Sequence, residues 1–310
     1  MAISCETFRK LSEHVGVFLH STNAGIINAG GGIYFIDSGS CAEDGSALIR
    51  SAGELFPGRK ILGILCTHAH TDHCGGSAHI KASTGCTVWA PEYDSHIMEC
   101  PGIMGDMYWG GKSFADIRAL SFENAEPVRA DISYSSEINL GEVVLEPVPL
   151  PGHFYGQTGI LARERDSDTR TFFMADAFFG ASMIKRYWIP FMQDPEKFRE
   201  SVERITCSRA DFYVPSHGDI YTGENINAIA ELNVMITREM EFIIIKLLRE
   251  KPRTVDELLK EIADFAGIEL GLSQYVLIGY TLRSYLSCMH DAGRIGFTLS
   301  GNIMRWHAKE

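Results

Sequence analysis

Three histidines and one aspartate occur within six residues, in the motif THAHTDH at positions 67–73. Imidazole nitrogens and carboxylate oxygens are the donors that Zn²⁺ takes in proteins where thiolates are absent. The motif directly follows the apolar segment 60–66, and α/β folds place their sites at the ends of buried strands. A lone histidine is more often a surface or packing residue, but this cluster predicts a metal site.

Three further donor residues follow apolar segments later in the chain. His153 follows Pro151-Gly152, Asp176 follows the segment 172–175, and His217 follows the segment 212–216. Each of them taken singly is more often a turn or capping residue than a ligand. Because each comes at the end of a predicted strand, we expect the set to meet the 67–73 motif at one rim of the fold.

The segments between these donors alternate between strand-like and helix-like patterns. This alternation is typical of mixed α/β layers. The predicted strands are 15–19, 24–27, 33–36, 60–66, 86–90, 143–149, 158–163, 171–175 and 211–214, and the predicted helices are 42–55, 77–83 and 195–206. The segment 91–135, with its glycines, prolines and scattered aromatic residues, predicts an irregular lid or binding loop.

The chain becomes mostly helical after residue 225. Apolar residues recur every three or four positions from Ile229 to Leu247, and Pro252 ends that helix. Thr254 and Glu257 form a predicted capping box for the next helix. A further helix over 273–292 and a hairpin of 295–298 with 303–306 complete a winged-helix-like pattern. We therefore predict a catalytic domain at 1–224 and a small helical, winged-helix-like domain at 225–310.

The ordered set of donors resembles the metallo-β-lactamase superfamily, over about residues 23–217. The matching features are His-x-His-x-Asp-His, then Pro-Gly-His, then an Asp after a strand, then a His before Gly. The resemblance implies an αββα four-layer sandwich with two metals at one edge of its sheets. It implies that one metal takes His68, His70 and His153, that the other takes Asp72, His73 and His217, and that Asp176 bridges them. It also implies that Asp37 orients a ligand, although a simple turn role before Gly39 fits the sequence equally well.

Individual positions distinguish between branches of the superfamily. Oxygen-reducing diiron members carry Glu where this chain has His70, and antibiotic-hydrolysing members lack the bridging carboxylate that Asp176 provides. Lactonases carry Tyr at the position of Phe179.

Three residues are candidates for substrate contact. Lys185 and Tyr187 match the spacing of two substrate-binding residues of glyoxalase II, although ordinary loop positions are the commoner explanation. Tyr155, two residues past His153, is a candidate proton donor, although packing is the commoner role for such a residue. The C-terminal segment departs from glyoxalase II and resembles a group of lactamase-fold hydrolases that includes endoribonucleases.

These features lead to the hypothesis of a metal-dependent hydrolase. Two divalent metals would share a bridging hydroxide that Asp72 orients. Zinc is the expected metal, and iron or manganese are the alternatives. No unambiguous general acid is visible, which favours a small, anionic ester, thioester or lactone over an amide. The alternatives are a mononuclear iron oxidoreductase similar to persulfide dioxygenases, and an endoribonuclease.

Charge and composition limit the kinds of binding partner that we expect for this chain. The formal net charge is −12, and residues 1–245 carry 19 Lys/Arg against 32 Asp/Glu. This acidic body disfavours a nucleic-acid partner and leaves a small-molecule substrate as the expectation. No apolar run is long enough for a membrane span, and eight single cysteines without an export signal predict reduced thiols in the cytoplasm. The C-terminal segment could also form a homodimer contact.

Overall fold

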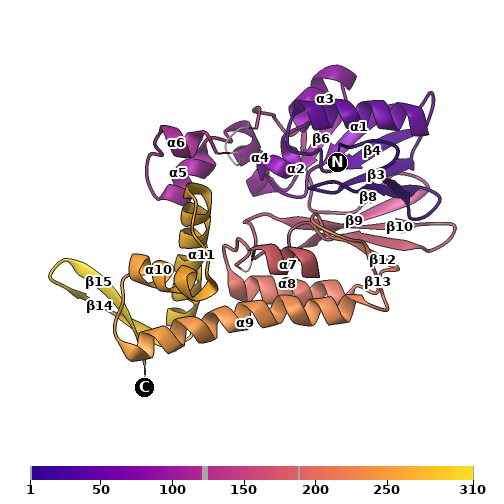
Figure 1. The fold of residues 1–310 in the computed structure, drawn as a ribbon. Helices are drawn as coiled ribbons and strands as arrows, with labels where there is room; N and C mark the ends of the chain where they lie inside the picture. Colours follow the sequence, from indigo (N-terminus) through magenta and orange to yellow (C-terminus); the bar gives the residue numbers. More distant parts are fainter. Residues whose placement is uncertain (1, 121–124, 188, 310) are drawn as a thin grey trace.

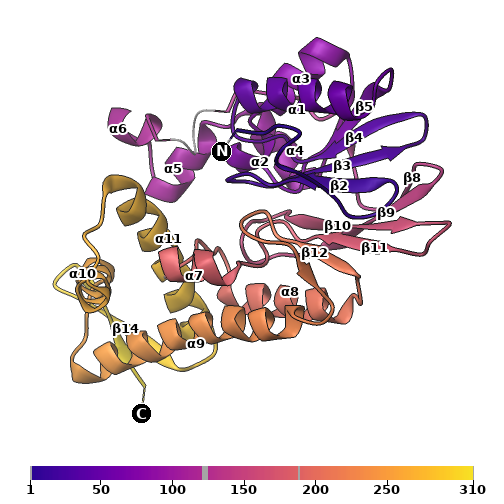
Figure 2. The same ribbon diagram turned by 45° about the vertical axis from the view of Figure 1, so that its right-hand side comes forward.

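Two β-sheets lie face to face in this protein, with helices over the outer face of each (Figure 1). The computed structural model describes residues 2–120, 125–187 and 189–309. A third, C-terminal group of helices extends away from the layered body and ends in a hairpin (Figure 2).

The first sheet has seven strands that follow one another in chain order. The strands from β1 to β4 pair antiparallel, and those from β4 to β7 pair parallel. Parallel neighbours need crossover connections, and helices α1, α2 and α3 lie in the first two of these. The elements are β1 (Phe8–Lys10), β2 (Val15–Phe18), β3 (Ala24–Ala29), β4 (Gly32–Ile36), α1 (Ala42–Leu55), β5 (Lys60–Leu65), α2 (Thr71–Cys74), α3 (Ser77–Thr84), β6 (Thr87–Ala90) and β7 (Ile132–Ser133).

The second sheet has six strands in the order β13-β12-β11-β10-β9-β8. Its pairs are antiparallel except for β11 with β12, which are connected through α7 and α8. Helix α8 begins where the side chain of Asp194 accepts hydrogen bonds from the backbone N–H groups of Glu196 and Lys197. The elements are β8 (Ile138–Asn139), β9 (Val143–Pro149), β10 (Thr158–Glu164), β11 (Arg170–Phe173), α7 (Ala181–Tyr187), α8 (Pro195–Cys207), β12 (Phe212–Val214) and β13 (Tyr221–Thr222).

Apolar side chains fill the space between the sheets and under the outer helices. Between the sheets, Ile27 and Leu65 of the first sheet share a buried cluster with Ile160 and Phe173 of the second. Helices α1 and α3 cover the other face of the first sheet, and α8 covers that of the second. The predicted αββα sandwich is therefore confirmed.

The C-terminal region consists of three helices and a hairpin, as expected from the sequence. They are α9 (Ile226–Glu250), α10 (Val255–Ala266), α11 (Leu272–Asp291), β14 (Ile295–Ser300) and β15 (Ile303–Ala308). Helix α10 begins with the predicted capping box of Thr254 and Glu257. Helix α9 packs along α8, so the region is attached to the sandwich. The winged-helix arrangement, a homodimer contact and the division at residue 225 stay predictions.

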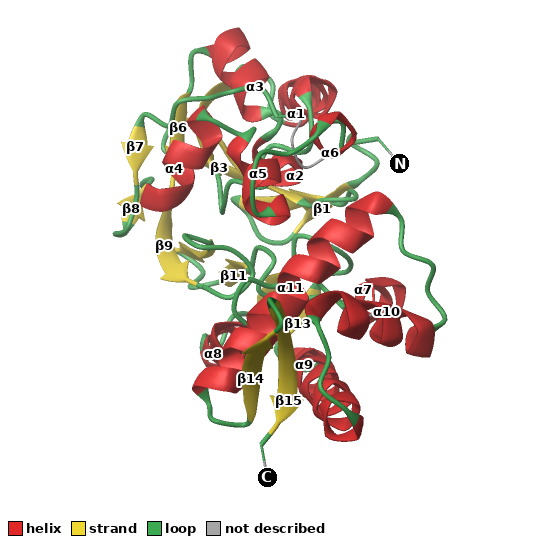
Figure 3. Cartoon of the chain, turned by 90° about the vertical axis from the view of Figure 1, so that its left-hand side faces the viewer, coloured by secondary structure: helices red, strands yellow, loops and turns green. Residues whose placement is uncertain are grey.

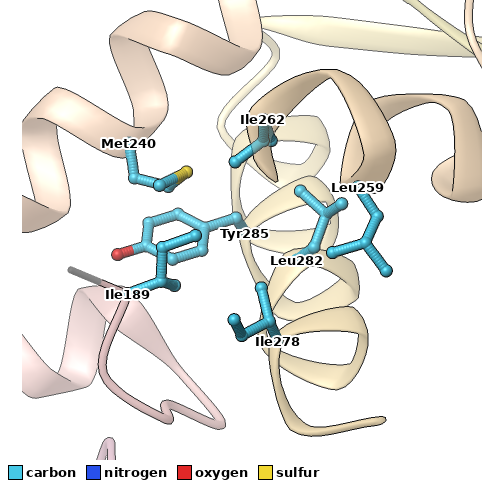
Figure 4. A pocket seen from close by; sticks show the side chains of 7 residues that line it. All are labelled: Ile189, Met240, Leu259, Ile262, Ile278, Leu282 and Tyr285. Atoms are coloured by element: carbon cyan, nitrogen blue, oxygen red, sulfur yellow. The ribbon is translucent and has the colours of Figure 1, made fainter. Parts of the chain in front are cut away.

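A small cavity lies between the helices of this region (Figure 4). Its volume is about 10 Å³, close to the space of one water molecule. It is lined by Ile189, Met240, Leu259, Ile262, Ile278, Leu282 and Tyr285. A space of this size and apolar character is a packing defect and not a substrate site.

The 91–135 segment differs from its prediction, because its described part contains three short helices. They are α4 (Glu92–Glu99), α5 (Ile103–Trp109) and α6 (Ala115–Arg118). The prolines and glycines that surround these helices indicated irregular structure in the sequence, and Gly110 ends α5 in a left-handed conformation. Helix α5 packs on α11 (Figure 3). Across the described ranges, no helix is both long and apolar enough to cross a membrane.

Candidate metal centre

All seven predicted donor residues lie together at one rim of the sandwich. They come from the loop after β5 with α2, and from the loops after β9, β11 and β12. They form two adjoining groups in which the donor atoms lie within 4.8 Å of one another. The first group is His68, His70, His153 and Asp176, and the second is Asp72, His73 and His217.

In the first group, three imidazole nitrogens face one another. The Nδ1 atom of His70 lies 3.0 Å from Nε2 of His68 and 3.0 Å from Nε2 of His153. The Oδ2 atom of Asp176 lies 3.4 Å from that same nitrogen of His153. Ring nitrogens that converge in this way place several lone pairs around one point, as a metal cation requires.

The second group meets the first through Asp176. The Nε2 atom of His217 lies 3.4 Å from Oδ2 of Asp72 and 3.4 Å from Oδ2 of Asp176. The Nε2 atom of His73 lies 3.6 Å from Oδ2 of Asp72 and 3.5 Å from Oδ1 of Asp176. Asp176 therefore faces both groups, as a bridging carboxylate would.

The nitrogen of each histidine that faces away from the centre has its own hydrogen-bond partner. Carboxylate and carbonyl oxygens can only accept hydrogen bonds, so they fix the proton of the imidazole on its outer nitrogen. The nitrogen that faces the centre then keeps a free lone pair. The pairs are His68 Nδ1 with Thr67 Oγ1 (3.1 Å), His70 Nε2 with Tyr108 Oη (2.8 Å), His73 Nδ1 with Asp37 Oδ2 (2.8 Å), His153 Nδ1 with the Phe191 carbonyl (2.9 Å) and His217 Nδ1 with the Ser21 carbonyl (2.6 Å).

Two inward-facing atoms have no hydrogen-bond partner among the described residues. They are Nε2 of His73 and Oδ1 of Asp176, and both are buried. Buried polar atoms in native proteins are nearly always paired, and a divalent cation would satisfy both of these atoms. The donor set and its geometry therefore fit a metal centre.

The charge state of the donors follows from burial and from their mutual contacts. Burial lowers the pKa of His70 to about 3 and holds the pKa of His68 well below its usual value. Burial opposes ionisation of the Asp176 carboxyl, but His217 and His73 outweigh it and hold the pKa of that group well below its usual range. Burial also opposes protonation of His73 and His217, but Asp72 and Asp176 outweigh it and raise the pKa of both imidazoles well above the usual value. Neutral imidazoles and ionised carboxylates bind metal, so metal binding at the second group would release protons from these two histidines.

Unusual backbone conformations directly precede two of the donors. Gly152 has a φ of 127° before His153, and Ala175 has a φ of 51° before Asp176. A left-handed conformation is costly for a residue with a Cβ, and such positions cluster at functional sites. Asp37 also has a left-handed φ, of 62°, and accepts hydrogen bonds from Thr67 and His73. Its contacts match the orienting role that the resemblance implies.

Of the three candidate substrate residues, only Tyr155 has a side chain within the described part of the structure. Tyr155 is 55% exposed, and its ring packs beside Phe154. Lys185 and Tyr187 lie in α7, and their side chains are outside the described part of the structure. The substrate roles of all three stay predictions.

Sequence patterns missed three residues that support the donors. Tyr108 and Phe191 contact His70 and His153, and Asp94 accepts a hydrogen bond at 2.8 Å from the backbone N–H of Ala69. Tyr108 and Asp94 lie in short helices without periodicity, and Phe191 acts through its carbonyl, so no residue spacing could identify them.

Comparisons with solved structures agree with the fold described above. The chain resembles a beta-lactamase domain protein from Burkholderia ambifaria, with a TM-score of 0.75 at 14% identity over 100% of this chain and 96% of that one. A metallo-beta-lactamase family protein from Thermus thermophilus gives a TM-score of 0.70 at 16% identity over 95% and 94% of the two chains. At these identities the likeness shows the fold alone.

A shorter sequence match and a family model complete the comparisons. A hydroxyacylglutathione hydrolase from Rhodopseudomonas palustris (strain BisB18) is 33% identical over 91 residues, which are 29% of this chain and 31% of that protein. The match thus spans about a third of that relative's length. The model of the Metallo-beta-lactamase superfamily matches residues 17–217, which include all seven donors. The chain belongs to the metallo-beta-lactamase superfamily.

Proposed function

We propose that this chain is a metal-dependent hydrolase with two divalent metals, of which zinc is the first candidate. The observation that carries the proposal is the convergence of seven donors, of which the five histidines are each hydrogen-bonded at the outer nitrogen. One metal would be held by His68, His70 and His153 and the other by Asp72, His73 and His217, with Asp176 between them. When bound, the metals would supply Lewis acidity for water activation and for polarising the substrate's carbonyl oxygen.

Asp72 marks the side from which substrate would approach. Its side chain is 40% exposed, whereas those of His73 and Asp176 are 0% and 6% exposed. Thr22 donates a hydrogen bond at 2.9 Å to Oδ2 of Asp72, which fixes the orientation of this carboxylate. An exposed and oriented carboxylate can accept a hydrogen bond from the attacking water.

A small anionic ester or thioester is the proposed substrate. Two divalent cations against the carboxylates of Asp72 and Asp176 leave a positive centre inside a protein of net charge −12. The partial match to a protein named hydroxyacylglutathione hydrolase puts a thioester first among the compounds to test. The eight cysteines are all free thiols, which supports the cytoplasm as the proposed compartment.

Metal analysis of the purified protein, combined with a panel of small esters and thioesters, tests the proposal. We expect two zinc ions per chain, and loss of turnover in His70→Ala. His96→Ala is the matched control, because His96 is exposed on α4 and outside the donor set. One iron per chain without hydrolysis would instead favour the oxidoreductase alternative.

A further inference from the structure

We propose that the C-terminal helix α11 positions the first donor group, by holding Tyr108 against His70 and Phe191 against His153. This inference rests on the proposed metal-dependent function. It gives the C-terminal region, which lies beyond residues 17–217 of the family match, a role in metal binding.

Tyr108 is the first of the two connections. Its hydroxyl lies 2.8 Å from Nε2 of His70, and this tyrosine is buried within α5. The Nδ1 atom of His70 faces the other histidines, so Nε2 carries the proton. The Nε2–H group then donates a hydrogen bond to the tyrosine oxygen. The Tyr108 ring packs edge-on against Tyr280 of α11, with centroids 5.4 Å apart. Val276 of α11 belongs to the same buried cluster as Tyr108.

Phe191 is the second connection. Its carbonyl accepts a hydrogen bond at 2.9 Å from Nδ1 of His153, and its ring stacks on that of Tyr280 with centroids 5.4 Å apart and planes 19° apart. The next residue is also held by α11, because Thr281 Oγ1 accepts a hydrogen bond at 3.1 Å from the Met192 N–H. Adjacent residues of one helix therefore fix both the ring and the backbone of this segment.

The second donor group has its supports in the sandwich. His73 is oriented by Asp37, which directly follows β4, and His217 is oriented by the carbonyl of Ser21. Ser21 and Thr22, which contacts Asp72, both lie between β2 and β3. A disturbance of α11 should therefore weaken metal binding at the first group and leave the second group unchanged.

The test is metal affinity, measured without reference to turnover. Co²⁺ titration, followed by its absorption bands and by chelator competition, reports binding at each group. Tyr108→Phe keeps the ring and removes the acceptor oxygen, and we expect about 10- to 100-fold weaker binding at the first group. The comparison of Tyr108→Phe with Tyr108 is repeated in a protein that also carries His217→Ala. Because His217→Ala removes a donor of the second group, the difference in affinity then reports the first group alone. Tyr93→Phe is the control, because Tyr93 is 70% exposed on the neighbouring α4.

Substitutions in α11 test the other half of the inference. Tyr280→Ala removes the ring that contacts both Tyr108 and Phe191, so it should weaken the first group as Tyr108→Phe does, whereas Tyr280→Phe should retain wild-type affinity. Circular dichroism of the metal-free variants separates loss of fold from loss of affinity. If Tyr280→Ala proves to be unfolded, the metal affinity of Tyr108→Phe decides the inference. Wild-type Co²⁺ affinity in Tyr108→Phe would overturn this inference alone. Failure of the wild-type protein to bind Co²⁺ or Zn²⁺ would overturn the proposed function as well.

Discussion

At the scale of single residues, the donors depend on neighbours that no metal-binding motif contains. Each histidine has one nitrogen directed to the centre because its other nitrogen is hydrogen-bonded, to Asp37 or to the Phe191 carbonyl for example. Outer partners of this kind set the tautomer and the ring orientation of a ligand. The motif therefore predicted which residues would meet, but it could not predict what holds them in position.

Asp94 provides a prediction at this scale. Burial raises the pKa of its carboxyl to about 7, and the hydrogen bond from the backbone N–H of Ala69 offsets part of that effect. Between the unfolded value of 3.8 and about 7, the folded protein holds a proton that the unfolded chain has released. This stabilising contribution is complete below the unfolded pKa and is lost as the pH rises through the folded one.

We therefore expect wild-type protein to lose more unfolding free energy than Asp94→Asn between about pH 5 and about pH 8. The slope is at most about 1.4 kcal/mol per pH unit. Denaturant unfolding with a chelator present measures it, and the histidine titrations common to both proteins cancel in the difference. Parallel pH curves for the two proteins would show that Asp94 is ionised across this range.

At the scale of elements, the turn before His153 depends on close backbone contact. The Gly152 carbonyl accepts hydrogen bonds from the N–H groups of Gln193 and Asp194 at the start of α8. A Cβ on Gly152 would lie 2.3 Å from the backbone nitrogen of Phe198. The turn and the helix are therefore packed too closely to admit a side chain at this position.

We expect Gly152→Ala to lower the melting temperature and to weaken metal binding, because the turn that carries His153 must move. Gly58→Ala is the matched control, since Gly58 has a φ of 79° and no atom lies within 4 Å of the position that its Cβ would take. That control should cost about 1 kcal/mol of stability through backbone strain alone and leave metal affinity intact. Equal losses in both variants would mean that the contact with α8 is unimportant.

The long elements were predictable from the sequence, whereas several of the short ones were not. Helix α1 and strand β9 have the predicted bounds, because 14 and seven residues give a clear pattern of apolar positions. Strands β1, β7 and β8 contain two or three residues, which is too few for any periodicity. Helices α4 to α6 lie in a segment whose prolines and glycines predicted irregular structure, and Tyr108 and Asp94 were missed with them.

At the scale of the whole molecule, the distribution of charge bears on the endoribonuclease alternative. Residues 246–310 carry nine Lys/Arg against eight Asp/Glu, so the C-terminal region offers little net attraction for phosphates beside an acidic body. We expect no binding of a short labelled RNA by metal-free protein at about 50 mM salt, measured by fluorescence anisotropy. Binding that weakens steeply between about 50 and 200 mM salt would restore that alternative.

The contact between α11 and the first donor group also has a consequence for the order of assembly during synthesis. A nascent chain that has emerged as far as His217 contains all seven donors, but it lacks Tyr280 and Thr281. The second group, supported within the sandwich, can be complete at that stage. The first group reaches its final geometry only after the C-terminal helix leaves the ribosome and docks, so we expect metal loading at the two groups to occur in that sequence.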